Sequence, residues 1–227
     1  MCWNKEISLN TFIFSAGTLA FVLYNNKYTQ YKIPFFENNY VVLFSILVIT
    51  VQLIEYFLWE SLNTKNQSMN QFWSIILFII IILQPVTALM WVTNTNVRNI
   101  LLTTYFVVYA ISFAIIPLKF ETLKHKSGHL QWLAFSFKNE LTIECFINYI
   151  RSIIWFVSFF TGFYYLLDFP YFLVVLTFTL LVMIYHYYKN ELNAFSSNWC
   201  WFANGFSLAF AFYLLFVLPY REYQQIC

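Results

Sequence analysis

The sequence predicts an all-α fold, a polytopic transmembrane bundle of seven helices that forms a single domain over residues 1–227. Composition is the first reason, because 61% of the residues are hydrophobic and 10% are charged, whereas charged residues make up about a quarter of an ordinary soluble protein. Seven separate apolar segments are the second reason. Each is close to the length of roughly 20 residues that a helix needs to cross the hydrocarbon core of a bilayer.

We predict helices for these segments because strands in lipid must close into a barrel to satisfy their backbone N–H and C=O groups. Barrel strands alternate apolar and polar residues, and none of the segments shows that alternation. The first segment lacks a clear small-residue cleavage site, so we expect it to be a retained span. The predicted spans are Ile7–Tyr24, Val41–Leu62, Phe72–Val92, Val97–Pro117, Tyr149–Leu167, Phe172–Tyr188 and Trp199–Leu218.

The connections between the segments are short except for one long loop between helices four and five. This loop, Lys119–Asn148, has about thirty residues, and structureless loops of that length are uncommon in compact domains. We expect it to pack on the bundle or to fold back into its mouth. Seven crossings place the N-terminus, this loop and the connections 63–71 and 189–198 on one side of the membrane, which we call the near side.

The orientation of the chain depends on how its basic residues are distributed. They are more numerous on the near side, which favours a cytoplasmic near side by the positive-inside rule. The excess comes from the long loop and Arg151. The near side also holds the sequon Asn66-Gln67-Ser68, whose glycosylation would require a lumenal location. Both orientations stay open, and so does the membrane in which the protein resides.

Composition and motifs exclude several classes of function. The net charge of +2 is small and dispersed, whereas nucleic-acid binding needs a concentrated basic surface, so the bilayer and not a nucleic acid is the expected partner. A retinal protein of the usual kind needs a lysine inside a helix, and Trp199–Leu218 has none; we expect no cofactor. The Cys and His residues lack the short spacings of zinc sites, so no metal site is predicted.

The strongest functional signal is a carboxylate inside the second apolar segment, in the stretch Gln52-Leu-Ile-Glu55-Tyr-Phe-Leu-Trp59-Glu60. Glu55 lies two turns inside the end of that segment. An ionisable group at membrane depth must face the bundle interior, a water-filled cavity or a partner, which makes Glu55 a candidate functional residue. The spacings of three and four place Gln52, Glu55 and Trp59 on one face of the helix.

Arg151 lies at a comparable depth near the beginning of the fifth segment. One hypothesis is that Glu55 and Arg151 pair or share a hydrogen-bond network, which offsets part of the cost of about 2.5 to 3.5 kcal/mol for a charge in a membrane helix. The alternative is that Arg151 reaches the lipid headgroups and that Glu55 is protonated.

Polar side chains of the other segments also gather towards the near side. Asn204 and His186 lie near the near ends of the seventh and sixth segments, and His129 lies in the long loop. Far-side polar residues stand chiefly at segment ends, where their side chains reach water. We therefore predict a polar pocket in the near half of the bundle. The predicted ligand-binding residues are Glu55, Gln52, Arg151, His129, Asn204 and Gln84.

Gln84 precedes Pro85 in the middle of the third segment. Proline has no backbone N–H, so it frees a carbonyl and usually kinks a helix, and neighbouring groups then satisfy the freed carbonyl. Such breaks line substrate paths in some transporters. The alternative is a packing kink, since proline is frequent in membrane helices.

Three of the four cysteines, Cys2, Cys145 and Cys200, fall on the near side, whereas Cys227 falls on the far side. A Cys2–Cys200 disulfide is expected if the near side is lumenal, and free thiols are expected if it is cytosolic.

Five short motifs occur in order along the chain: Met1-Cys2-Trp3-Asn4, Gln52…Glu55, Gln84-Pro85, Gly128-His129-Leu-Gln-Trp132 and Trp199-Cys200-Trp-Phe202. Together they resemble an uncharacterised family of multi-span membrane proteins from large DNA viruses, microbial eukaryotes and some bacteria, whose members typically begin with Met-Cys-Trp. The resemblance covers most of the chain. It implies a common helical bundle and no particular activity. Asn4 replaces the serine usual in the family, and the long loop is poorer in cysteine.

Three hypotheses for function follow from these patterns. The leading one is that the near-side pocket binds or moves a small polar ligand or a proton. A second is a membrane-embedded enzyme that acts on lipid, with Glu55 as general acid or base and His129 or His186 assisting. The third is a structural membrane component without a ligand, whose polar groups only fix helix packing.

Overall fold

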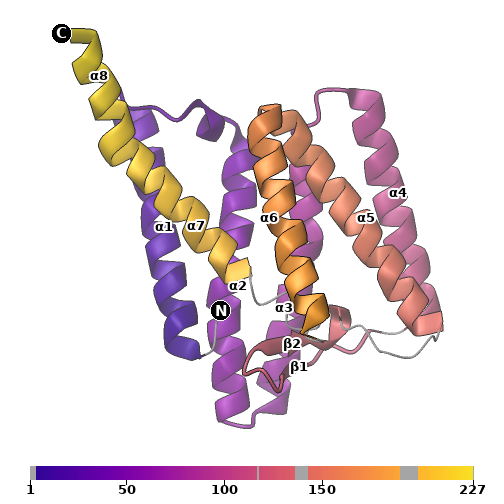
Figure 1. The fold of residues 1–227 in the computed structure, drawn as a ribbon. Coiled ribbons are helices and arrows are strands. Elements are labelled where there is room, and N and C mark those ends of the chain that lie inside the picture. The colour runs from indigo at the N-terminus through magenta and orange to yellow at the C-terminus, as the bar shows by residue number, and fades with distance from the viewer. Residues whose placement is uncertain (1–3, 117, 136–142, 190–198, 227) are drawn as a thin grey trace.

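A computed structural model of the chain describes residues 4–116, 118–135, 143–189 and 199–226 (Figure 1). It confirms the predicted all-α bundle, since seven helices are long and apolar enough to cross a membrane within the described residues. A short hairpin occupies part of the loop between the fourth and fifth helices. The elements are α1 (Lys5–Tyr28), α2 (Asn39–Asn63), α3 (Gln67–Leu89), α4 (Thr95–Ile115), β1 (Thr122–Lys124), β2 (Leu130–Trp132), α5 (Ile143–Leu166), α6 (Phe169–Tyr188), α7 (Trp199–Phe212) and α8 (Leu218–Ile226).

The first four helices all begin after an asparagine that caps them. The side-chain oxygen of each asparagine accepts a hydrogen bond from a backbone N–H in the first helical turn, which satisfies a group that has no partner within the helix. All four helices therefore begin two to five residues before the apolar segments predicted from hydropathy, because their first turns contain polar residues. The caps are Asn4, Asn38, Asn66 and Asn94.

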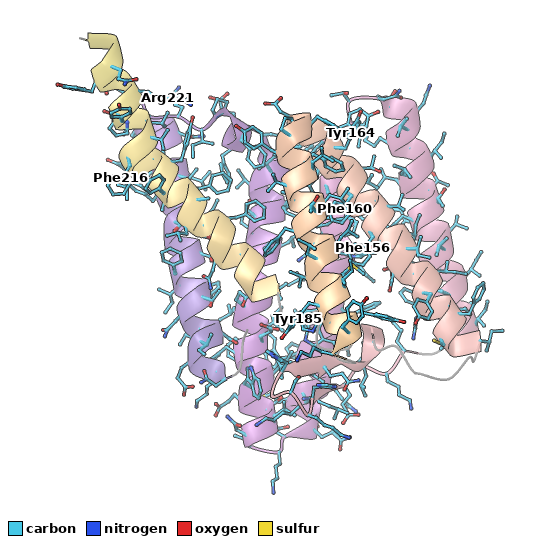
Figure 2. All side chains as sticks on the ribbon, in the orientation of Figure 1. Phe156, Phe160, Tyr164, Tyr185, Phe216 and Arg221 are labelled. Atoms are coloured by element: carbon cyan, nitrogen blue, oxygen red, sulfur yellow. The ribbon has the colours of Figure 1, made fainter. Side chains whose placement is uncertain are left out.

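Helix α1 has the reverse polarity of a soluble helix, whose apolar face is buried. Along α1 the buried face consists mainly of small polar residues, whereas large apolar side chains such as Phe14 and Tyr24 are exposed. Figure 2 shows side chains such as Tyr164 and Phe216 covering the outside of the bundle. This distribution fits a surface in contact with lipid. The buried polar residues of α1 are Ser8, Thr11, Ser15, Thr18 and Asn25.

Helix α2 lies between α1 and α3, and α3 in turn packs against α5, which carries α4 and α6 on its outer sides (Figure 1). The contact between α3 and α5 is very close at Gly162. A Cβ atom at Gly162 would lie 2.4 Å from the carbonyl oxygen of Ala88. Small residues allow such close approach of helix backbones in membranes, so Gly162 fixes the spacing of the two helices.

The far half of the bundle is filled by apolar side chains. Four aromatic residues form edge-to-face, tilted and stacked ring pairs with centroids 4.8 to 5.7 Å apart, namely Phe44 of α2, Trp91 after α3, and Phe159 and Phe163 of α5. They belong to one buried cluster that also includes Val22, which we call the far cluster. Because this cluster joins α1, α2, α3 and α5, it closes the far half of the bundle.

The C-terminal part extends the last predicted span. Tyr213–Val217 forms a π-helical turn between α7 and α8, in which the N–H of Leu218 donates to the carbonyl of Tyr213. The turn lies directly before Pro219 in α8, which has no N–H to donate. The Glu222 carboxylate accepts hydrogen bonds from Gln30 and from the Tyr31 hydroxyl, and the bond to Glu222 raises the pKa of Tyr31. The C-terminal helix is thereby attached to the α1–α2 connection.

Gly162→Ala is expected to destabilise the protein, because the added methyl group would force α5 away from Ala88. Overpacking of this kind costs about 1–3 kcal/mol. The matched control is Gly205→Ala in α7, where nothing lies within 4 Å of the added carbon. Alanine favours helix over glycine by about 1 kcal/mol, so the control should keep or raise stability. Thermal unfolding of the detergent-purified variants measures both stabilities. Equal unfolding temperatures of the two variants would contradict the role of Gly162 in setting the distance between α3 and α5.

Candidate polar site on the near side

The long loop contains a short antiparallel hairpin at the near side, with Thr122 opposite Trp132 and Lys124 opposite Leu130. Its turn is closed by the N–H of His125, which donates to the carbonyl of His129 at 2.7 Å. Gly128 takes a φ of 85° in this turn, a conformation that glycine adopts without steric cost. His125 and His129 therefore lie at the two ends of a turn.

The hairpin is bound to α3 by two polar side chains. The Asn70 side chain accepts from the Thr122 N–H at 2.9 Å and donates to the Thr122 carbonyl at 3.0 Å. It thus pairs with Thr122 as a neighbouring strand would. The Ser74 and Thr122 hydroxyls lie 2.8 Å apart, one helical turn further along α3. Because all three residues are buried, these bonds fix the hairpin against the bundle.

The inner face of the hairpin packs into the bundle. Leu130 and Trp132 belong to one buried cluster with Ile54 and Leu58 of α2 and Leu77 of α3. The prediction that the long loop packs on the bundle is therefore confirmed for its hairpin. Non-helical backbone near the membrane is tolerated where protein covers it, and α2 and α3 provide that cover.

Glu55 and Gln52 are both fully buried, with 0% of each residue exposed. Their depth follows from the ion pair between Lys5 and Glu60, whose atoms are 2.9 Å apart and which aligns the start of α1 with the end of α2. Glu55 precedes Glu60 by five residues, which places it about 8 Å deeper at 1.5 Å per residue. Glu55 therefore lies inside the bundle, at the depth reached by the second turn of α1.

Asn204 of α7 donates a hydrogen bond to the Thr11 hydroxyl of α1 at 3.1 Å. Thr11 follows Lys5 by six residues, about 9 Å along α1, and so lies at nearly the same depth as Glu55. Thr11 is buried, and Asn204 is partly buried. The structure thus places Asn204, Thr11 and Glu55 in one layer of the near half, on three adjoining helices.

Arg151 is buried at the boundary between α4 and α5, with 3% of the residue exposed. Its guanidinium donates to the Ser112 hydroxyl and the Ser112 carbonyl, both at 2.7 Å, and to the Asn148 side chain at 3.1 Å. Ser112 lies in the last turn of α4, where the helix dipole favours a cation. These bonds anchor Arg151 to α4, whereas Glu55 lies on α2. A direct contact between Glu55 and Arg151 stays a prediction.

His129 of the predicted pocket is also buried, and so is His186, which the enzyme hypothesis names as an assisting residue. His129 follows the turn of the hairpin, and His186 is on the inner face of α6, close to its near end. Cys145 is buried at the start of α5. Cys2 and the side chain of Cys200 lie outside the described residues, so their predicted disulfide stays a prediction. Within the part of the chain that the structure describes, no three His, Cys, Asp or Glu residues are grouped as metal ligands.

Gln84 lies deeper than the other predicted residues and is 0% exposed. Neither its amide oxygen nor its amide nitrogen has a hydrogen-bond partner among the described residues, and the same holds for the buried hydroxyl of Ser158. Two contacts join α3 to α5 on either side of this level, the Ile81–Trp155 hydrogen bond and the Ala88–Gly162 contact. In each contact the α5 residue number exceeds the α3 residue number by 74, and the same difference separates Ser158 from Gln84. Gln84 and Ser158 therefore lie at one level of the α3–α5 interface.

Pro85 leaves the carbonyl of Ile81 without its usual helical donor, and α5 supplies the replacement. The Trp155 indole N–H donates to the Ile81 carbonyl at 2.9 Å. On the α4 side, the Tyr105 hydroxyl donates to the carbonyl of Ile82, also at 2.9 Å. The prediction that neighbouring groups satisfy the break is confirmed. The break therefore connects α3 to two other helices.

Several residues of the site were not predicted from the sequence. Asn70 and Ser74 share one face of α3 by their spacing of four, which was the available signal. The other residues are small and polar and lie in apolar segments, and their sequence positions do not indicate which residues they bind. They are Ser112, Ser158 and Thr11. Protein-family models, curated proteins and solved structures were compared with the chain, and none of them matches it.

Trp155→Phe is expected to destabilise the protein by about 1–3 kcal/mol, because it leaves the Ile81 carbonyl buried without its donor. Pro85→Ala restores the backbone N–H that bonds this carbonyl. In the Pro85→Ala background Trp155→Phe should therefore cost less, with a coupling of about 1 kcal/mol in a double-mutant cycle. Chemical or thermal unfolding of the four proteins measures the coupling. Strictly additive costs would show that Trp155 contributes only by packing.

Proposed function

We propose that this multi-pass membrane protein binds a proton or a small polar ligand in the near half of its bundle, at Glu55. The observation that carries the proposal is a carboxyl and an amide, Glu55 and Gln52, both fully buried inside a membrane-spanning helix. Ionisable groups at such positions commonly mark ligand sites and proton relays.

The charges around the site favour a proton or a cationic ligand. Arg151 directs three donors to Ser112 and Asn148 on α4 and α5, so the Ser112 carbonyl and two side-chain oxygens stabilise its charge there. Asn204 and Thr11 contribute an amide and a hydroxyl at the depth of Glu55. A carboxyl with amide and hydroxyl neighbours suits a donor such as a protonated amine.

Movement beyond the near half would pass Gln84 and Ser158. The hydrogen bond between Ser61 and Asn70 places these residues of α2 and α3 at one depth. Gln84 follows Asn70 by 14 residues and Glu55 precedes Ser61 by six, so Gln84 lies about 12 Å further from the near side than Glu55 at 1.5 Å per residue. Two buried polar groups without partners at this level suit a transient water or ligand. The far cluster lies beyond them, so passage requires its rings to separate.

The motif residues also support membership of the Met-Cys-Trp family, which we propose on the resemblance alone. Gln52, Glu55, Gln84, His129 and Trp132 are all buried inside the bundle. Residues that a family shares at interior positions would hold a common helical arrangement together.

Glu55→Gln is expected to lower proton flux at least tenfold, because glutamine keeps the shape of the acid but exchanges no proton. The full chain is reconstituted into potassium-loaded vesicles with an internal pH-sensitive dye, and flux is started with valinomycin. Glu60→Gln is the matched control, since Glu60 is on the same helix but half-exposed and paired with Lys5. It should keep its flux and lose at most about 1 kcal/mol of stability.

A ligand other than a proton would be detected by thermal unfolding, because a bound ligand stabilises the folded state. Ammonium, methylammonium and choline are the probes, and stabilisation should occur in the wild type and not in Glu55→Gln. The proposal fails if neither flux nor ligand stabilisation distinguishes Glu55→Gln from the wild type. That outcome would leave the polar groups with a purely structural role.

Gln84→Leu is expected to raise thermal stability while lowering flux. Replacing a buried amide that lacks partners by an apolar group of similar size removes a desolvation cost of about 1–3 kcal/mol. A residue retained for function and not for stability shows this opposite pair of effects. If Gln84→Leu instead destabilises the protein and leaves flux unchanged, Gln84 holds the helices together and lies outside the path.

A further inference from the structure

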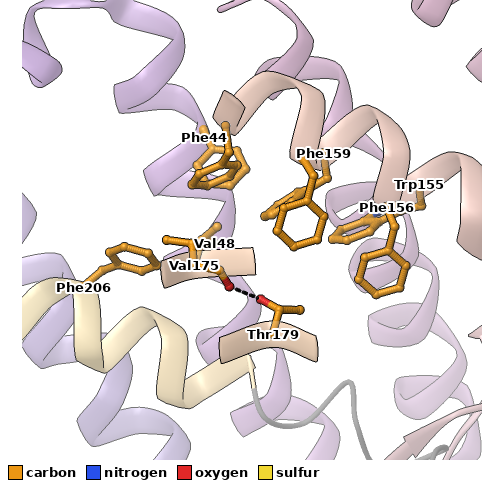
Figure 3. A pocket seen from close by; sticks show the side chains of 10 residues that line it. Phe44, Val48, Trp155, Phe156, Phe159, Val175, Thr179 and Phe206 are labelled. Carbon is orange, nitrogen blue, oxygen red and sulfur yellow. Dashed lines mark hydrogen bonds between the residues drawn. The ribbon is translucent and has the colours of Figure 1, made fainter. Parts of the chain in front are cut away.

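We propose that a cavity between α2, α5, α6 and α7 binds one hydrocarbon chain of a membrane lipid. The cavity has a volume of about 40 Å³, which is several times the roughly 10–15 Å³ that a single water needs on the same measure. Figure 3 shows Val175 and Phe206 on one side of it and Trp155, Phe156 and Phe159 on the other. This inference is independent of the function proposed for Glu55.

The lining of the cavity offers no polar hydrogen to a ligand. Among its residues only Thr179 and Trp155 carry a side-chain N–H or O–H. The Thr179 hydroxyl donates to the Val175 carbonyl at 2.8 Å (Figure 3), and the Trp155 indole donates to Ile81. The remaining lining residues are Val and Phe. A polar ligand would therefore lose its hydrogen bonds with water and gain few in return.

The chemistry of the lining favours hydrocarbon as the occupant. An acyl chain would restore the dispersion contacts that the Val and Phe side chains lose beside an unfilled space. A buried water needs two to four polar partners, and the lining does not supply them. The cavity lies in the middle of the spans, since Val48 is near the centre of α2 and Val175 is in the first half of α6. At this depth the surrounding medium is the acyl chains of the bilayer.

The cavity lies beside α6, and most of this helix faces the bilayer. Only two residues of α6, Thr179 and His186, are buried, so most of this helix faces outward. Val174, next to the lining residue Val175, is 68% exposed. A lipid chain that enters beside α6 would contact Phe44 and Val48 of the central helix α2. It would then complete the packing of α2 and α6 from the side.

The test uses a phospholipid with a photoactivatable diazirine in its acyl chain, added in trace amounts to phosphatidylcholine nanodiscs that hold the full chain. Cross-linked residues are identified by mass spectrometry. We expect labelling of Phe206 and Phe156 to exceed, by at least fivefold, that of the outward-facing Phe106 and Ile111 on α4. Equal labelling of the two sets would overturn the proposal.

Val175→Trp fills the cavity, and Val174→Trp is the matched control because it adds the same side chain on the outer face of the same helix. Labelling of Phe206 should fall at least fivefold in Val175→Trp and stay unchanged in Val174→Trp. If Val175→Trp misfolds, the smaller Val175→Leu and Val174→Leu repeat the comparison. Unchanged labelling in a folded Val175 variant overturns the proposal. Oxidation of Val175→Cys to a disulfide-linked dimer would also overturn it, since a second copy would then cover the cavity.

Discussion

The structure depends on one constraint: a polar group that leaves water in a membrane must find its partner within the protein. Three contacts follow from it, two between helices and one between a helix and the hairpin. Trp155 of α5 satisfies the carbonyl that Pro85 frees in α3, Asn70 of α3 pairs with the backbone of Thr122, and Arg151 of α5 binds the end of α4. Lipid and apolar side chains attract a helix about equally, so such polar contacts determine which helices become neighbours.

The fold was predictable from the sequence because segments of about 20 apolar residues in lipid must hydrogen-bond their own backbone groups. A helix is the only single segment that does so. The ends of the helices were less predictable, since capping residues such as Asn66 lie outside the apolar segments that hydropathy detects. The hairpin of the long loop was not predicted as strands at all. Its strands have three residues each, and they depend on Asn70 and Ser74, which are distant in sequence. A pairing supplied by another part of the chain leaves no local pattern.

The depth of the candidate site in the membrane was predictable from the sequence, but the hydrogen-bond partners of its residues were less so. Glu55 and Gln52 are buried as expected, because their spacing fixes a common helix face. The partners of Arg151 were not foreseen, since a depth argument compares levels along the membrane normal and carries no information about which neighbour lies beside a residue. Ser112 lies beside Arg151 because α4 packs against α5, and a comparison of depths does not identify that neighbour.

The near half and the far half of the bundle differ in what holds them together, and this difference connects the polar site with the apolar cavity. Polar contacts such as Asn204–Thr11 join helices near Glu55, whereas aromatic rings join them in the far cluster. Phe44, Phe159 and Phe163 belong both to the far cluster and to the lining of the cavity. A chain bound in the cavity therefore packs against the same rings that close the far half. Because a ligand favours the conformation that binds it better, occupancy of the cavity favours the closed far half over any state in which these rings separate.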